Sequence, residues 1–183
     1  GMGGAMVGSA GVIATVTRPV GEPAGRRSLV AGHLPRCDPS AANPAAMTGR
    51  LHAWLRQAHS DLAMAAYASQ GGFHAQACYH CSQAAEKALK ALLLALDQEP
   101  ERTHSIERLL CSLELLGIEA APLRLLPLKA LQRMTTASRY PDGDEAPVDL
   151  FDARDGALAL EVARAVVGFA DQQLGELIEP ETS

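Results

Sequence analysis

A row of polar side chains recurs at helical spacing and contains the residue types that bind phosphate groups. The row runs through a segment rich in alanine and leucine, and its members are Gln76, His80, Gln83, Lys87 and Lys90. At 100° per residue these side chains fall within a wedge of about 80°. Lysine and histidine can bind a phosphate, and a glutamine amide can hydrogen-bond a base or a sugar. The same spacing also fits a solvent-exposed face, so spacing alone leaves both interpretations open.

Two shorter motifs outside this segment add side chains of the same chemical kinds. His104 stands at an expected helix start, where its ring either caps backbone donors or points into the fold. Arg139 and Tyr140 precede Pro141, which disfavours helical geometry at Tyr140. In one interpretation Tyr140 plugs the end of the bundle and Arg139 pairs with an aspartate of the following loop. In the other, Arg139 lies beside the polar row and binds a phosphate or an RNA 2′-hydroxyl.

The four cysteines do not form a recognisable metal or redox motif. Cys78 and Cys81 make a CxxC pair with His74 four residues before it, so the three side chains could approach one helix face. A structural zinc site needs a fourth ligand, and redox pairs usually stand at a helix start. We therefore predict that Cys78, Cys81 and Cys111 are small buried apolar side chains and that Cys37 is an exposed thiol. No motif calls for a metal or a cofactor.

Composition divides the chain into a leader of residues 1–46 and a folded domain of residues 47–183. Gly1 precedes a methionine and is interpreted as a scar of tag cleavage. The leader is rich in glycine, proline and alanine and is expected to be disordered. Its four arginines face only Glu22 and Asp38, whereas the whole chain has a net charge of −5. Met47 stands where the helical pattern begins, so either translation starts there or the leader is an ordinary tail.

Length and charge exclude several classes of protein. With 16 basic and 21 acidic residues, the chain does not resemble a protein that coats nucleic acid through net charge. No apolar run reaches the ~18 residues of a membrane span, and four cysteines are too few for a disulfide scaffold. We therefore expect a cytoplasmic protein that does not bind membranes. The absence of a serine triad, a glycine-rich phosphate loop and an HExxH motif argues against conventional hydrolases and ATPases.

The domain that positions these residues is expected to be an all-α, up-and-down bundle of four to five helices. From Met47 onward there are 24 Ala and 23 Leu against 4 Val and 3 Ile, a balance that favours helix over strand. Helices are predicted over about 48–70, 73–97, 103–117, 128–138 and from 152 onward, with a short or kinked segment at 122–127 and a loop at 141–147. The helix over 73–97, nearly 40 Å long at about 1.5 Å per residue, is the expected spine.

The ends and apolar stripes of these helices are specific predictions. Thr103 is expected to cap the third helix, and Asp152 with Asp155 the last one. The stripes predicted to be buried are Leu51, Trp54, Leu55, Ala58, Leu62, Ala65 and Ala66 in the first helix, Phe73, Ala77, Cys81, Ala84, Ala88 and Leu92 in the second, Ile106, Leu109, Leu110, Leu113 and Leu116 in the third, and Leu158, Val162, Ala165, Val166, Phe169 and Leu174 in the last.

Together these residues resemble the HEPN family of small, mostly prokaryotic helical domains. The matching pieces are AHSDLAMA at 58–65, SQAAEKALKAL at 82–92 within the helix that starts at Phe73, THS at 103–105 and RYPD at 139–142. They occur in the family's order, and the resemblance covers about residues 50–175. It implies an up-and-down bundle that dimerises, with paired helices forming a cleft at the interface.

The resemblance also implies two functional classes. Many HEPN proteins are metal-independent RNases that use an arginine followed after four to six residues by a histidine. The histidine helps to move the 2′-hydroxyl proton, and the arginine stabilises the phosphorane charge. Other members lack this pair and serve as partners of small nucleotidyltransferases, as in toxin–antitoxin pairs, or as nucleotide-binding modules. Here no histidine follows His104, so no arginine of the folded region has the required histidine downstream.

The expected function is therefore that of a non-catalytic, homodimeric module that binds a nucleotide or RNA, or a nucleotidyltransferase. The expected ligand-binding residues are His80, Gln83, Lys87, Lys90, Arg139 and Tyr140. An RNase would need an unusual active site that combines Arg139 with His80 or His104. A dimerisation module without a ligand is the third hypothesis. The acidic net charge favours a protein partner or a small nucleotide over extended nucleic acid.

Overall fold

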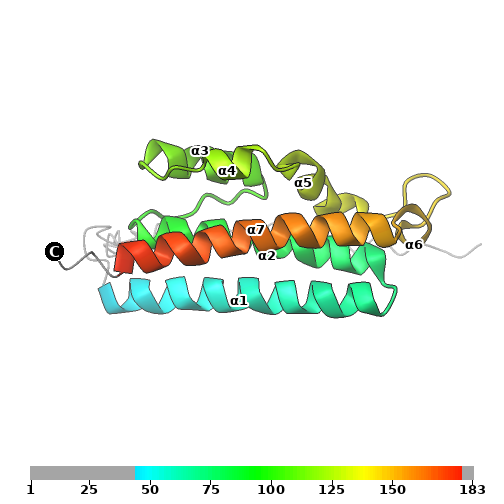
Figure 1. Cartoon of the computed structure of the whole chain (residues 1–183), viewed down its shortest axis with the longest axis horizontal. Helices are drawn as coiled ribbons and strands as arrows, with labels where there is room; N and C mark the ends of the chain where they lie inside the picture. The colour runs from blue at the N-terminus through cyan, green and yellow to red at the C-terminus, as the bar shows by residue number, and fades with distance from the viewer. Residues whose placement is uncertain (1–43, 179–183) are drawn as a thin grey trace, which may run out of the picture. The chain divides into compact units, whose positions relative to one another are not determined.

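A computed structural model describes residues 44–178, which form a helical bundle (Figure 1). The elements are α1 (Pro44–Gln70), α2 (His74–Ala95), α3 (Ile106–Leu115), α4 (Ala121–Arg124), α5 (Leu128–Ala137), α6 (Pro147–Leu150) and α7 (Ala153–Ile178). Within the described residues the nearest approach to a strand is an isolated bridge between Asp142 and Glu145. The prediction of an all-α bundle is confirmed. The sequence pattern placed the first helix start at residue 48 and did not predict α6.

The bundle consists of the long helices α1, α2 and α7 and of a third segment that is divided into the short helices α3, α4 and α5 (Figure 1). The long helices α1 and α2 run in opposite directions because only three residues join them. The chain then returns through α3, α4 and α5 before α7 runs back parallel to α2 (Figure 1). This is the up-and-down order expected from the sequence. No helix of the described chain has the apolar length that a membrane span requires.

The second helix is the spine of the bundle, as predicted. Of its 22 residues 15 are buried, and it packs against α1, α3, α5 and α7. Alanines let α1, α2 and α7 approach closely in one cluster, formed by Ala58, Ala84, Ala88, Val167 and Ala170. A larger cluster around Leu89 and Leu92 joins α2 to the leucines of α3. Polar side chains on α2 are therefore held by a helix with little freedom to move.

Local chemistry explains where the last helix begins and where the first one ends. Asp152 Oδ1 accepts hydrogen bonds from the backbone N–H groups of Arg154 and Asp155. Asp155 Oδ2 accepts in return from the N–H of Asp152, so the two residues form the reciprocal cap that the sequence predicted. At the end of α1, Gly72 adopts a φ of +78°, a conformation that glycine reaches without strain.

The predicted cap of the third helix is wrong. Ser105 caps α3, because its Oγ accepts a hydrogen bond from the backbone N–H of Arg108. Thr103 lies two residues outside, and its Oγ1 accepts from the N–H of Ser105. Thr103 therefore orders the loop that leads into the cap.

The predicted apolar stripes are largely buried in their middles and exposed at several ends. Phe73, Leu116 and Leu158 are 59%, 40% and 45% exposed, and Ala165 is also exposed. Phe73 precedes α2, and Leu116 follows α3 where the chain turns at Gly117, so neither side chain continues the face of its helix. In α7 the predicted phase is wrong at Leu158 and Ala165, because the buried face of the helix runs through their neighbours Ala159 and Val166 instead.

Candidate functional site

Burial increases along the polar row of α2. Gln76 is exposed and Gln83 is half-buried. The side chain of His80 is 29% exposed, that of Lys87 is 19% exposed and that of Lys90 is 8% exposed. The row is thus neither a solvent-exposed face nor an open phosphate site along its whole length.

Asp61 of α1 joins two members of the row. Its Oδ2 lies 2.7 Å from Lys87 Nζ, and its Oδ1 lies 3.2 Å from His80 Nδ1. Lys87 also donates a hydrogen bond of 3.1 Å to Gln83 Oε1. Because an ionised carboxylate only accepts, the proton of a neutral His80 sits on Nδ1, and Nε2 is left as an acceptor. The charge of Lys87 is compensated inside the bundle.

A second carboxylate, Glu86, holds the other end of the row. Lys90 Nζ donates to Glu86 Oε1 over 2.8 Å, and both side chains are buried. His104 Nδ1 lies 3.0 Å from Glu86 Oε2, while the rest of its side chain remains exposed. The ammonium of Lys90 also lies 5.5 Å from the centre of the Trp54 ring, within range of a cation–π contact. The His104 ring therefore contacts a side chain of α2 and does not cap backbone donors of the described chain.

Arg139 has different surroundings. Its Cζ lies 4.9 Å from the centre of the Tyr79 ring and 5.1 Å from that of Tyr140, and its Nε donates to the carbonyl oxygen of Thr135. The rings of Tyr79 and His80 meet edge to face with their centres 5.2 Å apart. Arg139 is exposed and has no carboxylate partner within residues 44–178. The expected pairing of Arg139 with a loop aspartate is therefore wrong.

The structure separates the predicted ligand-binding residues into two groups. Tyr79 contacts both His80 and Arg139, and Arg139 also lies over Tyr140. We name these four residues the arginine–tyrosine cluster. The remaining members, Gln83, Lys87 and Lys90, have their polar groups engaged by Asp61 and Glu86 or by one another. Tyr140 is 57% exposed, so it does not plug the end of the bundle.

Sequence reasoning missed Asp61, Tyr79 and Glu86. Asp61 carried a usable signal, because it stands between Ala58 and Ala65 on the apolar side of the first helix. An acid at such a position needs a partner to compensate for the cost of burial. Glu86 carried a weaker signal, since its i,i+4 spacing to Lys90 also fits an ordinary surface pair.

The cysteines divide by burial. Burial raises the pKa of Cys78 and of Cys81 to about 12, and both side chains are fully enclosed, which confirms the prediction. The prediction for Cys111 is wrong, because it is exposed and its Sγ accepts a hydrogen bond of 3.1 Å from Arg124. On α3 it follows Leu110, so the 100° step turns it away from the core. Cys37 lies outside the described residues. Between residues 44 and 178 no three potential ligands are grouped to hold a metal ion.

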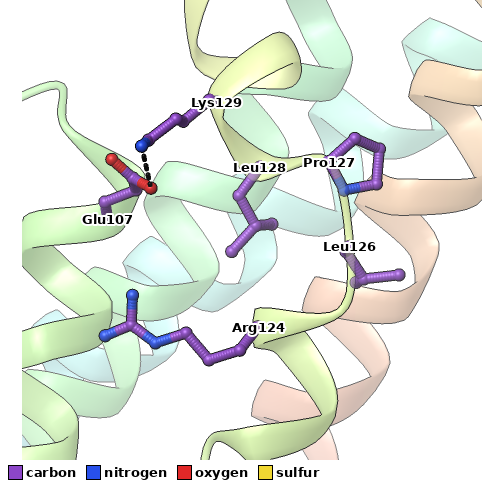
Figure 2. Close-up of a pocket in the computed structure, with 6 residues that line it drawn as sticks. All are labelled: Glu107, Arg124, Leu126, Pro127, Leu128 and Lys129. Atoms are coloured by element: carbon purple, nitrogen blue, oxygen red, sulfur yellow. Dashed lines mark ion pairs between the residues drawn. The ribbon is translucent and has the colours of Figure 1, made fainter.

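A pocket of about 240 Å³ lies between α3 and α5, and no member of the polar row lines it (Figure 2). Figure 2 shows Arg124 and the pair of Lys129 and Glu107 around it, with Leu126 and Pro127 on the connecting chain and Leu128 at the start of α5. Lys129 Nζ is 3.6 Å from Glu107, and Arg124 is paired with Glu114. Because both cations already face carboxylates, we assign no ligand to this pocket.

Comparison with known proteins gives one family and two similar structures. The family model of the HEPN domain matches residues 51–173. The crystal structure of TT1696 from Thermus thermophilus is 32% identical in sequence, with a TM-score of 0.62 over 68% of this chain and 98% of the other. That of ST0689, described as an archaeal HEPN homologue, is also 32% identical, with a TM-score of 0.57 over 68% and 97% of the two chains. No curated protein matches the chain.

Proposed function

Since the chain belongs to the HEPN domain family, we propose that it is a non-catalytic member that binds a nucleotide or RNA at the arginine–tyrosine cluster. The observation that carries this proposal is the state of Arg139. Its guanidinium is exposed, is held over two tyrosine rings and has no carboxylate partner among residues 44–178. A guanidinium of this kind can bind a phosphate through two parallel hydrogen bonds, and an exposed tyrosine ring can stack on a base.

In this proposal the lysines of the polar row do not contact the ligand but stabilise the helix packing around the site. Lys87 and Lys90 were expected to bind phosphate, but their ammonium groups are paired with Asp61 and Glu86. They would hold α1 and the loop before α3 against α2 and so fix the position of Tyr79 and His80. With one unpaired cation in the cluster, a mononucleotide or a short single strand fits better than an extended duplex, which needs several phosphate contacts.

Two further elements of the proposal come from the family. We propose that the chain acts as a homodimer, because the HEPN domain it matches is one that commonly dimerises. We also propose that it serves as the partner of a small nucleotidyltransferase, as in toxin–antitoxin pairs. Nucleotide binding at Arg139 and a protein partner elsewhere on the surface are compatible with each other.

A metal-independent RNase is the second candidate, and one contact favours it. The carboxylate of Asp61 fixes His80 Nδ1 and leaves Nε2 as an acceptor beside the ring that Arg139 covers. Such a histidine could take the proton of a 2′-hydroxyl, with Arg139 compensating the charge that develops on the phosphorus group. This arrangement would replace the arginine-to-histidine spacing that the sequence lacks.

Thermal shift measurements on the full chain test the proposal. ATP, GTP, mononucleotides and short RNAs are added in turn, and a ligand that binds only the folded state raises the Tm by mass action. We expect a rise for the wild type and for Arg108→Ala, a remote exposed arginine that serves as control, and no rise for Arg139→Ala. A rise that persists in Arg139→Ala would place the ligand elsewhere. Absence of any rise, with a dimer in solution, would favour the ligand-free dimerisation module.

An RNA cleavage assay in the presence of a chelator separates the two candidates. The non-catalytic proposal predicts no cleavage by the wild type. If the wild type cleaves RNA and both His80→Ala and Arg139→Ala fail to do so, the RNase candidate replaces it.

A further inference from the structure

A broad groove beside α5 and α6 lies outside the contacts that hold the arginine–tyrosine cluster together. Its volume is about 630 Å³, within the size range of ligand-binding clefts. The residues that line it are Gln132, Arg133, Thr136, Ala137, Tyr140, Pro141, Asp142 and Leu150. Only Tyr140 is shared with the arginine–tyrosine cluster.

Large apolar side chains are exposed around this groove. Tyr140, Val148 and Leu150 are 57%, 70% and 40% exposed, and all three stand within one short stretch of chain. The helix α6 has only four residues, none of them buried, so Val148 and Leu150 are not turned into the core. Scattered apolar side chains on a surface need no explanation, but a group of them beside a groove is typical of an interaction site.

The loop before α6 and α6 itself add unpaired negative charge. Asp142, Asp144, Glu145 and Asp149 are exposed, and none has an ion-pair partner within the described chain. Elsewhere some exposed or half-exposed acids pair with basic side chains, as Glu99, Glu101, Glu107 and Glu114 do, but others, such as Glu119 and Glu161, are unpaired within residues 44–178 and isolated along the chain. Against these four carboxylates, the residues that line the groove include one basic side chain, Arg133.

Backbone hydrogen bonds keep these carboxylates together. The N–H of Asp142 donates to the carbonyl of Glu145 over 3.1 Å, and the N–H of Glu145 donates back over 3.2 Å. The turn from Asp142 to Glu145 also contains Asp144, so like charges stand at neighbouring positions of one turn, and a cation would compensate them.

We propose that the α5–α6 groove and the acidic loop 142–149 together dock a cationic amphipathic segment of a partner protein. Apolar side chains of that segment fill the groove beside Tyr140 and Leu150, while its arginines or lysines pair with the carboxylates of the loop. A nucleotide or an RNA strand is repelled by the same four charges. The docking surface is therefore a protein site, and it does not depend on nucleotide binding at Arg139.

Fluorescence anisotropy with a short labelled peptide tests this proposal on the full chain. The probe is a helical-pattern peptide of arginine and leucine. One control peptide has glutamate in place of arginine, and the other has serine in place of leucine. We expect the probe to bind more tightly than both controls, and its affinity to fall as salt is added. Equal affinity for the serine peptide would overturn the proposal, because the groove would then have no role.

Matched variants locate the binding site. The triple variant D142N/D144N/E145Q should bind the probe about tenfold more weakly than the wild type. The control variant D97N/E119Q/E161Q removes the same charge from exposed acids that do not line the groove, and its affinity should stay within about twofold. Equal losses in both variants would reduce the effect to net charge and overturn the proposal.

Two further measurements exclude other occupants. If the V148S/L150S variant turns a wild-type dimer into a monomer in light scattering, the groove is covered by a second copy of this chain and the proposal fails. If labelled oligouridylate RNA binds the wild type and is lost in the D142N/D144N/E145Q variant, the surface is a nucleic-acid site and the proposal also fails. Arg139 does not line the groove, and Arg139→Ala keeps the Tyr140 ring that both sites share, so this variant should lose the nucleotide thermal shift but keep its peptide affinity. The failure of either proposed site can then be recognised separately.

Discussion

The two ends of the polar row on α2 use similar residue types in opposite surroundings. At the C-terminal end, Lys90 and Glu86 are buried and bonded to each other, and Lys87 is bonded to Asp61. At the other end, Arg139 is exposed, lies over two tyrosine rings and has no carboxylate partner in the described chain. A cation that already has a buried counter-charge holds the fold together, whereas a cation without one is available to a ligand.

This comparison predicts that the first group matters for stability and the second for binding. Removal of one member of a buried ion pair leaves an uncompensated charge inside the protein. Truncation of an exposed arginine removes little more than a surface contact. The variants below test this division, in order of the expected loss of stability.

The largest loss is expected for Glu86→Ala. It leaves the ammonium of Lys90 buried without its carboxylate, at a cost of about 3 kcal/mol in the free energy of unfolding. Urea denaturation measures the loss. As a control, the double variant Glu86→Leu/Lys90→Leu removes both charges and should recover most of the stability. If the single and double variants are equally unstable, packing rather than charge holds this end of the row.

The next largest loss is expected for Asp61→Ala. This variant removes the counter-charge of Lys87 and the hydrogen-bond acceptor of His80, and the loss of a half-buried ion pair and a hydrogen bond to a carboxylate is expected to cost about 2 kcal/mol. The same urea titration applies, with Asp171→Ala as an exposed comparison, because Asp171 pairs with the exposed His59. Equal effects of the two variants would contradict the division between buried and exposed pairs.

A small loss is expected for Arg139→Ala. An exposed cation–π contact contributes about 0.5–1 kcal/mol, so the variant should remain folded with nearly wild-type urea stability. It should nevertheless lose the thermal shift produced by the nucleotide. Arg139→Lys is informative beside it, since it keeps the charge but not the planar fork that grips a phosphate. A strongly destabilised Arg139→Ala would place Arg139 with the structural group.

The smallest change in stability is expected for Asp152→Asn. Asp152 caps α7, a structural role that the acidic residues of the preceding loop lack. Backbone N–H groups of Asp155 and Arg154 hold the pKa of Asp152 below its usual value. A carboxyl whose pKa is lowered by folding contributes stability that is fully present above its unfolded value of about 3.9 and is lost as the pH falls through the folded value.

Urea titrations between about pH 6 and pH 3 measure this effect. The stability difference between the wild type and Asp152→Asn should shrink as the pH falls, because the variant keeps an oxygen cap that cannot ionise. Asp144→Asn is the control, and its difference from the wild type should depend much less on pH. A difference for Asp152→Asn that is constant over the range would show that its charge contributes nothing.

Most of the fold could be predicted because helical phase and chain breaks are local properties. The alanine- and leucine-rich composition, Gly71–Gly72 and the pair Asp152 and Asp155 gave the main helices and two of their ends. The exposure of Phe73 could not be predicted, because it depends on where a neighbouring helix ends, whereas that of Cys111 follows from the phase of α3 and could have been predicted. A periodic pattern gives the direction of a side chain but not the extent of the surface it meets.

The site was predictable in its residue types and not in its partners. The sequence placed His80, Lys87 and Lys90 on one wedge of α2, and that wedge exists. Which members are free depends on Asp61 of α1 and on the turn after α5, and both contacts join residues far apart in the chain. Charge compensation across such distances has no spacing rule, so the distinction between the paired lysines of the row and the unpaired Arg139 beside it required the three-dimensional structure.

The division of the third segment into α3, α4 and α5 has a consequence for local unfolding of the protein. The helices α1 and α2 are joined by three residues and bury a long shared face, so they form a local unit expected to fold early. The third segment consists of short helices, and these pack against α2 and α7. We expect amide hydrogen exchange to show that the free energy of opening is lower for this segment than for α2. Arg139 and Tyr140 follow α5 directly, so each such opening would disassemble and reform the arginine–tyrosine cluster while the ion pairs between α1 and α2 stay closed.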